Sequence, residues 1–163
     1  MDEKEKKLIA ELRKNGREKV TEIAGKHGLS ASTLFDVLHR MEGRGVLKHT
    51  SLVDFQSLGY QTHLIFIIKT TIPNRSRLKE YLSKEGNINM LLQINSGFDY
   101  MFEALFRNQR EASDFITRME SENRIVEMTI HNIIDVVHRE KFLTEEWHFE
   151  EEKDVIRNYK EDS

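Results

Sequence analysis

The apolar residues of the first 45 positions recur three or four residues apart, which is the spacing of one face of an α-helix. They form three short stripes: Leu8, Ile9 and Leu12; Val20, Ile23 and Ala24; and Leu34, Val37, Leu38 and Met41. The stripes are followed by residues suited to the left-handed conformation that ends a helix, at Asn15-Gly16, at Gly28, and at Gly43 and Gly45. The pattern therefore predicts three small helices, with Ser30 as the N-cap of the third.

Beyond Gly59 the pattern changes to one of strands alternating with helices. Four runs have the composition or alternation of strands, and they begin at Thr62, Ile88, Phe98 and Val126. The second and third flank a turn-forming cluster, Asn95 to Gly97, which indicates a hairpin. The fourth is predicted to reach Val136, because apolar residues occupy its alternate positions except at Asn132. Two helical stripes lie between the strands: Leu78, Tyr81 and Leu82; and Ala112, Phe115, Ile116 and Met119.

This order of elements predicts an α+β fold. A winged-type helix-turn-helix domain of three helices is followed by a ferredoxin-like βαββαβ domain, a four-stranded antiparallel sheet with two helices on one face. We place the helix-turn-helix domain at residues 1–45, a hinge strand and linker at 46–60, and the βαββαβ domain at 61–142. Residues 143–163 are left as an acidic tail, either a frayed helix or disordered. The aromatic stripe of the third strand is expected to be core under the helices: Phe98, Tyr100, Phe102 and Phe106.

The stretch from Glu22 to Gly45 has the spacing of a helix-turn-helix. A small residue, Ala24, allows the two helices to cross closely, Gly28 follows four residues later at the turn, and Leu34 anchors the second helix. The alternative is a plain three-helix bundle with no role on DNA, because short patterns of this kind arise in unrelated bundles.

Composition excludes several classes of protein. The chain of 163 residues has no cysteine, so it has no disulfide framework or thiolate metal site. Its first fourteen residues are too charged for a signal peptide and its longest apolar run is too short for a membrane span, so we expect a cytoplasmic protein with no membrane partner. The net charge of -3 is uneven, since residues 1–60 carry 11 Lys and Arg against 9 Asp and Glu, whereas residues 140–163 carry 4 against 9.

The pattern gives no support for catalysis or metal binding. The seven histidines never fall four residues apart on one helix with a carboxylate between them, so no metal site is expected. Asp99 and Glu103 share one face of a predicted strand, but a solvated sheet face or an oligomer interface explains them without a substrate. Because the chain has no recognisable nucleophile, glycine-rich phosphate loop or cofactor motif, we expect neither an enzyme nor a cofactor.

Three segments resemble the Lrp/AsnC, or feast/famine, family of regulators. NGREKVTEIAGKHGLSASTL resembles the family's helix-turn-helix, MEGRGVLKHTSLVDFQSLGY its exit and hinge, and SGFDYMFEALFRNQREASDFI the core of its sensor domain. The resemblance covers roughly residues 2 to 142. It implies a transcription regulator that binds double-stranded DNA, dimerises through its βαββαβ domains and often assembles into tetramers or octamers. In many members an amino acid or similar metabolite binds between those domains.

The chain departs from the family pattern at the helix expected to read DNA. Family members commonly carry several arginines where this chain has Phe35, Asp36 and Val37, so their base contacts do not transfer. They also often carry a capping serine where Lys19 stands, so the second helix is expected to begin without that hydroxyl.

We therefore expect the DNA contacts to be divided among three groups of residues. Phosphates are met by Ser30, Ser32 and Thr33, with charge supplied by Arg17, Lys19, Arg44 and Lys48. Ala31 and Phe35 are candidates for contact with thymine methyl groups, and His39 and Arg40 for polar contacts with bases. Asp36 repels phosphate and accepts only from a donor such as the cytosine amino group, so it acts as a filter.

The second half of the chain carries two further expectations. An effector is expected at the turn formed by Asn95, Ser96, Gly97 and Asp99, where the family has a Gly-x-x-Asp loop; the alternative is a tight hairpin turn with Asp99 as its cap. A homodimer is expected through residues 60–142, because one face of the sheet is left uncovered. Its apolar patch is predicted to comprise Met101, Leu105, Ile125, Ile133 and Val137.

One alternative of a different class stays open. The chain could be a sensor or assembly protein whose helical domain mainly makes protein contacts. The operator, the effector and the direction of regulation are not determined by the pattern.

Overall fold

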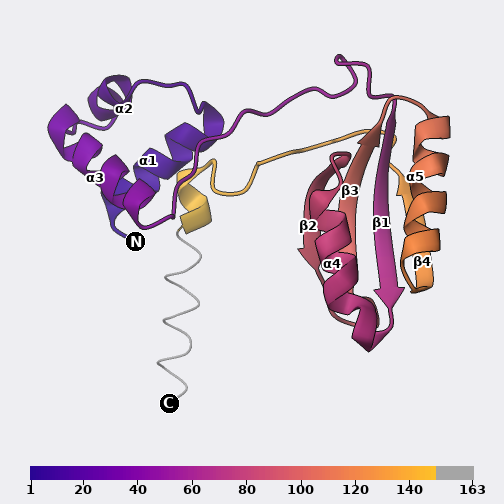
Figure 1. Cartoon of the computed structure of the whole chain (residues 1–163). Coiled ribbons are helices and arrows are strands. Elements are labelled where there is room, and N and C mark those ends of the chain that lie inside the picture. The colour runs from indigo at the N-terminus through magenta and orange to yellow at the C-terminus, as the bar shows by residue number, and fades with distance from the viewer. Residues whose placement is uncertain (150–163) are drawn as a thin grey trace. The chain divides into compact units, whose positions relative to one another are not determined.

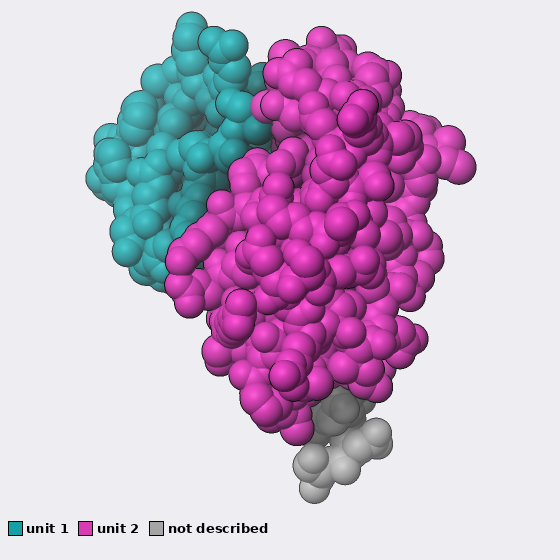
Figure 2. Space-filling view, turned by 45° about the vertical axis from the view of Figure 1, so that its right-hand side comes forward, with its two compact units in different colours: residues 1–51, 137–163 teal, residues 52–136 magenta. Residues whose placement is uncertain are grey.

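The computed structural model describes residues 1–149, which fall into two compact units (Figure 2). Unit 1 holds residues 1–51 together with the C-terminal residues from 137 onward, and unit 2 holds residues 52–136. The chain therefore leaves unit 1, forms unit 2 and returns to unit 1. The sequence pattern had predicted that residues 137–142 belong to the βαββαβ domain and that residues 143–163 form a separate tail.

Unit 1 contains three helices at the predicted places: α1 (Glu3–Lys14), α2 (Val20–Lys26) and α3 (Ala31–Gly43) (Figure 1). Their apolar stripes meet in one core, in which Leu8, Ile23 and Leu34 are fully buried. Gly28 adopts a φ of 64° between α2 and α3, a conformation that costs other residues energy, and the N–H of Leu29 donates to the carbonyl of Ala24 at 2.9 Å. The helix-turn-helix geometry is therefore present.

The helix ends agree with the sequence only in part. The hydroxyl of Ser30 accepts from the N–H of Thr33 at 3.2 Å, which confirms the N-cap of α3, and Lys19 begins α2 without a side-chain cap. Positive φ occurs at Gly28 and Gly45 but not at Gly16, and Gly43 belongs to α3 itself. Within residues 44–61, all of which are described, no strand forms. The predicted hinge strand and the wing it implies are therefore absent from this chain, because the segment has no neighbouring strand to pair with.

Unit 2 is a four-stranded antiparallel sheet with two helices, as predicted. Its strands are β1 (Thr62–Thr70), β2 (Ile88–Gln93), β3 (Tyr100–Phe106) and β4 (Ile125–Asn132). Its helices are α4 (Arg75–Lys84), preceded by the short η1 (Ile72–Asn74), and α5 (Gln109–Glu122). The strand order β2-β3-β1-β4 puts the two central strands side by side, with Phe66 of β1 opposite Phe102 of β3. This is the ferredoxin-like arrangement (Figure 1).

The core of unit 2 lies between the sheet and its two helices. The rings of Phe66 and Phe102 stack with centroids 4.6 Å apart, and Phe115 of α5 meets Phe66 edge-on at 5.8 Å. Tyr100 and Phe106 are buried on the same face. The aromatic stripe is therefore core, as expected, except that Phe98 lies in the turn before β3.

The C-terminal part differs from the sequence prediction. β4 ends at Asn132, which pairs with Leu64 near the beginning of β1, so almost no strand is left for later residues to pair with. Ile134 and Val136 are exposed instead of continuing the strand. Residues Glu146–Phe149 form a short 3-10 turn, η2, and residues 150–163, which hold most of the predicted tail, lie outside the described part of the chain.

Candidate nucleic-acid interface and sensor site

The outer face of α3 carries most of the side chains predicted to read DNA. Ser32, Asp36 and His39 are exposed, Ala31 is half-buried and the ring of Phe35 is 41 % exposed. The opposite face is closed against the core by three buried residues: Leu34, Val37 and Met41. A helix with one fully packed and one open face can enter a groove without disturbing its own domain.

The hydroxyls at the start of α3 are linked to one another. The oxygen of Ser30 lies 2.6 Å from that of Thr33 and 3.2 Å from that of Ser32. Ser30 also accepts from the N–H of Thr33. The three predicted phosphate ligands are thus brought together at one helix N-terminus, where backbone N–H groups point outward.

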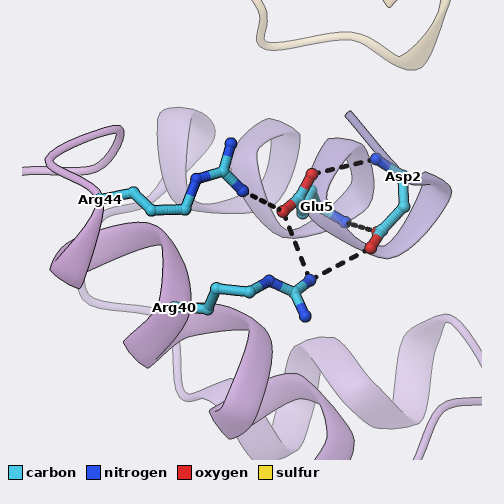
Figure 3. A network of polar contacts seen from close by, with 4 residues as sticks. All are labelled: Asp2, Glu5, Arg40 and Arg44. Atoms are coloured by element: carbon cyan, nitrogen blue, oxygen red, sulfur yellow. Dashed lines mark hydrogen bonds and ion pairs between the residues drawn. The ribbon is translucent and has the colours of Figure 1, made fainter.

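Arg40 and Arg44 form ion pairs with Asp2, the N-cap of α1, and with Glu5 in the first turn of α1 (Figure 3). Nη2 of Arg40 donates to Oδ2 of Asp2 at 3.1 Å and to Oε1 of Glu5 at 3.3 Å. Nη1 of Arg44 donates to the same Glu5 oxygen at 3.2 Å. Glu5 is only 5 % exposed, so this acid ties the start of α1 to the end of α3 from within the fold. The two arginines that the sequence assigned to DNA therefore also hold the helices together.

Asp2 and Glu5 form a reciprocal cap that explains their position. The N–H of Glu5 donates to Asp2 at 2.8 Å, and the N–H of Asp2 donates back to Glu5 at 3.0 Å. The backbone N–H of Asp2 lowers the pKa of Glu5 below its ordinary value of 4.5, against the opposing effect of burial, and Arg40 lowers it further. The N–H of Glu5 likewise lowers the pKa of Asp2. Sequence reasoning missed both acids, although an acid three residues before a glutamate at the start of an apolar stripe is a helix-capping signature.

Arg40 and Arg44 are exposed despite these ion pairs, and three further predicted cations lie at the surface of unit 1. Arg17 and Lys48 are exposed and, among residues 1–149, their side chains form no ion pair. Lys19 is exposed and lies 3.4 Å from Glu22, one turn further along the chain. The basic character available to DNA is therefore smaller than the sequence suggested.

The predicted effector residues do not all share one surface. Asn95, Ser96 and Gly97 are exposed at the tip of the β2–β3 hairpin, where Ser96 and Gly97 both have positive φ. Asp99 is buried, and its two oxygens accept from the N–H of Thr70 at 2.8 Å and from Nε of Arg75 at 2.6 Å. The carboxylate therefore anchors the hairpin to the end of β1 and the start of α4.

Glu103 lies apart from Asp99, on the face of the sheet that carries no helix. Nε2 of His63 is 2.5 Å from one oxygen of Glu103, and Nδ2 of Asn89 donates to the other. Glu103 is 8 % exposed, and the three side chains form a polar cluster on a face that carries both apolar residues, such as Ile67, and polar ones, such as Thr129. Because Asp99 and Glu103 have separate partners, they are not arranged as an acid and base on one substrate.

Neither a metal site nor a membrane span is found in the described part of the chain. Residues 1–149 contain no group of three or more His, Asp or Glu side chains placed to hold a metal ion. No helix among these residues combines the length and apolar character needed to cross a bilayer.

Comparison with known proteins shows which proteins this chain resembles. Residues 1–42 match the AsnC-type helix-turn-helix domain. The HTH-type transcriptional regulator FL11 of Pyrococcus furiosus is 28 % identical over 141 residues, which is 86 % of this chain and 93 % of the relative. The chain therefore carries an AsnC-type helix-turn-helix and is similar over most of its length to an HTH-type transcriptional regulator.

Two solved structures share the fold of this chain over most of its length. The structure of B. subtilis LrpC superposes with a TM-score of 0.76 at 23 % identity, covering 85 % of this chain and 97 % of that one. Transcriptional regulator NMB0573 of Neisseria meningitidis, solved as a complex with L-Met, gives a TM-score of 0.78 at 16 % identity, covering 85 % and 93 %.

Proposed function

We propose that this regulator binds double-stranded DNA with the outer face of α3 in the major groove. The observation that carries the proposal is the two-sided character of α3, with Leu34 fully buried and Phe35 next to it open to solvent. This role is one of binding and involves no catalysis. It places the protein in the cytoplasm, where the DNA is.

The proposed DNA contacts are made by side chains and backbone amides that the fold leaves exposed. Ser30, Ser32 and the N-terminal amides of α3 meet a phosphate, and Arg17 and Lys48 supply unpaired charge. Ala31 and Phe35 meet thymine methyl groups, and Asp36 selects against guanine at its position by accepting only from a base donor such as the cytosine amino group. A good bidentate base contact discriminates by about 1–3 kcal/mol, so a face with so few donors gives one dimer modest selectivity.

The proposal includes a homodimer formed through the helix-free face of the sheet. Ile67 pairs with Met101 across β1 and β3, and Met101 pairs with Leu92 of β2, so the three side chains lie on that face together. Leu105 lies there as well, but Ile125 packs against the core, because a bulge between Lys69 and Thr70 shifts the β4 register and pairs Ile125 with Thr70. Val137 belongs to unit 1. The dimer patch is therefore narrower than the sequence suggested, and tetramers or octamers would be built from this dimer.

The proposal also includes an amino acid or a similar metabolite as effector, held at a subunit interface near the exposed hairpin tip. NMB0573, a structural relative, was solved with L-Met. The exposed residues Asn95, Ser96 and Gly97 can offer backbone and amide groups to such a ligand, whereas Asp99 supports the hairpin from below. We therefore expect titration calorimetry with common amino acids to detect an effector whose affinity falls in Asn95→Ala.

The DNA proposal is tested by incubating the protein with fragments of the source genome at a defined salt concentration and sequencing the fragments that it retains. We expect A/T-tolerant sites repeated about one helical turn apart, because adjacent dimers multiply a weak contact. Asp36→Arg should raise affinity for random duplex, since it replaces a charge that repels phosphate with one that attracts it. If neither the protein nor Asp36→Arg retains duplex DNA at 50 mM salt, the helical unit serves protein contacts instead.

A further inference from the structure

The C-terminal strap, residues 138–149, packs on α1 of the helix-turn-helix unit. Its last residue, Phe149, is 3 % exposed and belongs to the core formed by the three helices, and Leu143 packs against the edge of that core. In Figure 1 the short turn η2 lies beside α1, in agreement with the contacts between the two elements. The strap is therefore a docked part of unit 1.

The strap also covers the two cations in the last turn of α1. Nε of Arg13 donates to the carbonyl of Phe142 at 2.9 Å, and the Arg13 guanidinium pairs with Glu140. Nζ of Lys14 lies 3.3 Å from Glu145. Two acidic side chains of the strap thus neutralise two adjacent basic residues.

Arg13 and Lys14 lead directly into the basic surface proposed for DNA. The loop of residues 15–19, which separates α1 from α2, carries Arg17 and Lys19. A phosphate that meets this loop lies close to the end of α1. Glu140 and Glu145 occupy the positive charges that such a phosphate would otherwise use.

We propose that the strap is an autoinhibitory contact in which Glu140 and Glu145 compete with DNA phosphate for Arg13 and Lys14. The proposal rests on the DNA-binding role of unit 1. The two parts of the strap have different roles. Phe149 anchors the strap in the core of unit 1, and Glu140 and Glu145 determine how much positive charge on unit 1 is accessible to DNA. Both ion pairs are partly exposed, and exposed pairs add little to stability, so removing the acids should leave the fold intact.

The test uses the full chain and the double variant Glu140→Gln/Glu145→Gln. Dissociation constants for a random-sequence duplex are measured by fluorescence anisotropy between 50 and 200 mM salt. The variant should bind more tightly at low salt. The plot of log affinity against log salt should become steeper by about 0.9 for each cation that gains a phosphate. Circular dichroism checks that the variant is folded.

A matched control separates the strap from net charge. Glu120→Gln/Glu122→Gln removes the same two charges from exposed positions of α5 in unit 2, away from the proposed dimer face, and should leave the salt slope unchanged. An equal gain in both variants, or no gain in the strap variant while the unchanged protein binds, overturns the autoinhibitory role alone. If no form of the protein binds the duplex at 50 mM salt, the DNA-binding function falls with it.

Discussion

Arg44, which caps the end of α3, donates to Glu5 in the first turn of α1 at 3.2 Å, and Glu5 is almost completely buried. Arg40 shares the same carboxylate oxygen. An arginine held in this way contributes to two properties at once, because it stabilises the helix packing and carries charge near the proposed DNA surface.

Replacing these arginines should therefore lower stability and DNA affinity together. We expect Arg40→Ala/Arg44→Ala to lower the denaturant concentration at the midpoint of unfolding, because the buried carboxylate of Glu5 is left with fewer hydrogen-bond donors. Glu3→Gln, which changes an exposed acid of the same turn, is the matched control and should change the midpoint much less. DNA affinity must be compared at a temperature where every variant is folded. Unchanged affinity at low salt in the folded double variant would remove both arginines from the interface.

The same cluster predicts a loss of stability in acid. The pKa values of Asp2 and Glu5 are lowered in the folded protein, so the folded state binds fewer protons than the unfolded state between the folded and unfolded pKa values. Their contribution is complete above the ordinary values of 3.8 and 4.5 and is lost as the pH falls through the lowered ones. Urea midpoints from pH 7 to pH 3 should fall less for Asp2→Asn/Glu5→Gln than for the unchanged chain. Parallel curves for the two proteins would contradict this assignment.

Lys19 marks a place where the protein can be stabilised. It begins α2 without accepting a hydrogen bond from the helix, so Lys19→Ser should raise the free energy of unfolding by about 1 kcal/mol through a new N-cap. Lys19→Ala removes the same cation without adding a cap and should give no gain. A comparison of the two by thermal denaturation isolates the cap.

Phe149 and Phe142 form a matched pair on the strap. Phe149 is fully packed in the core of unit 1, whereas Phe142 is 69 % exposed. Phe149→Ala should cost about 3–5 kcal/mol, the usual loss for truncating a buried phenylalanine. Phe142→Ala should change stability by less than about 0.5 kcal/mol, as is usual for surface positions. Similar losses in both variants would show that the strap is not anchored through Phe149.

If the dimer forms through the helix-free face of the sheet, a charge introduced on that face should dissociate it. Met101→Arg places a cation among Ile67 and Leu92 and should give monomers in sedimentation velocity at micromolar concentration. Ile72→Arg, at an exposed position of η1, should leave the dimer intact. A sedimentation coefficient that does not change in Met101→Arg would place the interface elsewhere.

The order of elements could be predicted from the sequence because local rules determine it. Helical spacing of Leu34, Val37 and Met41, the positive φ of Gly28 and the alternation of Tyr100, Phe102 and Phe106 are properties of short segments, and the structure confirms them. The same helical spacing also predicted which residues of α3 face the solvent. The sequence also showed that its charge was weak, since the helix begins with serine, alanine and threonine.

Only the tertiary structure determined which charged side chains are paired within the protein and which are left to bind a ligand. Arg40 and Glu5 are 35 residues apart, and Arg13 and Glu140 are 127 apart, so no local pattern reveals that they pair. The same holds for Asp99, which meets the N–H of Thr70, and for Phe149, which completes a core built from the other end of the chain. Hydrogen bonds and ion pairs depend on distances of a few ångströms between side chains, and those distances exist only once the helices and strands have packed.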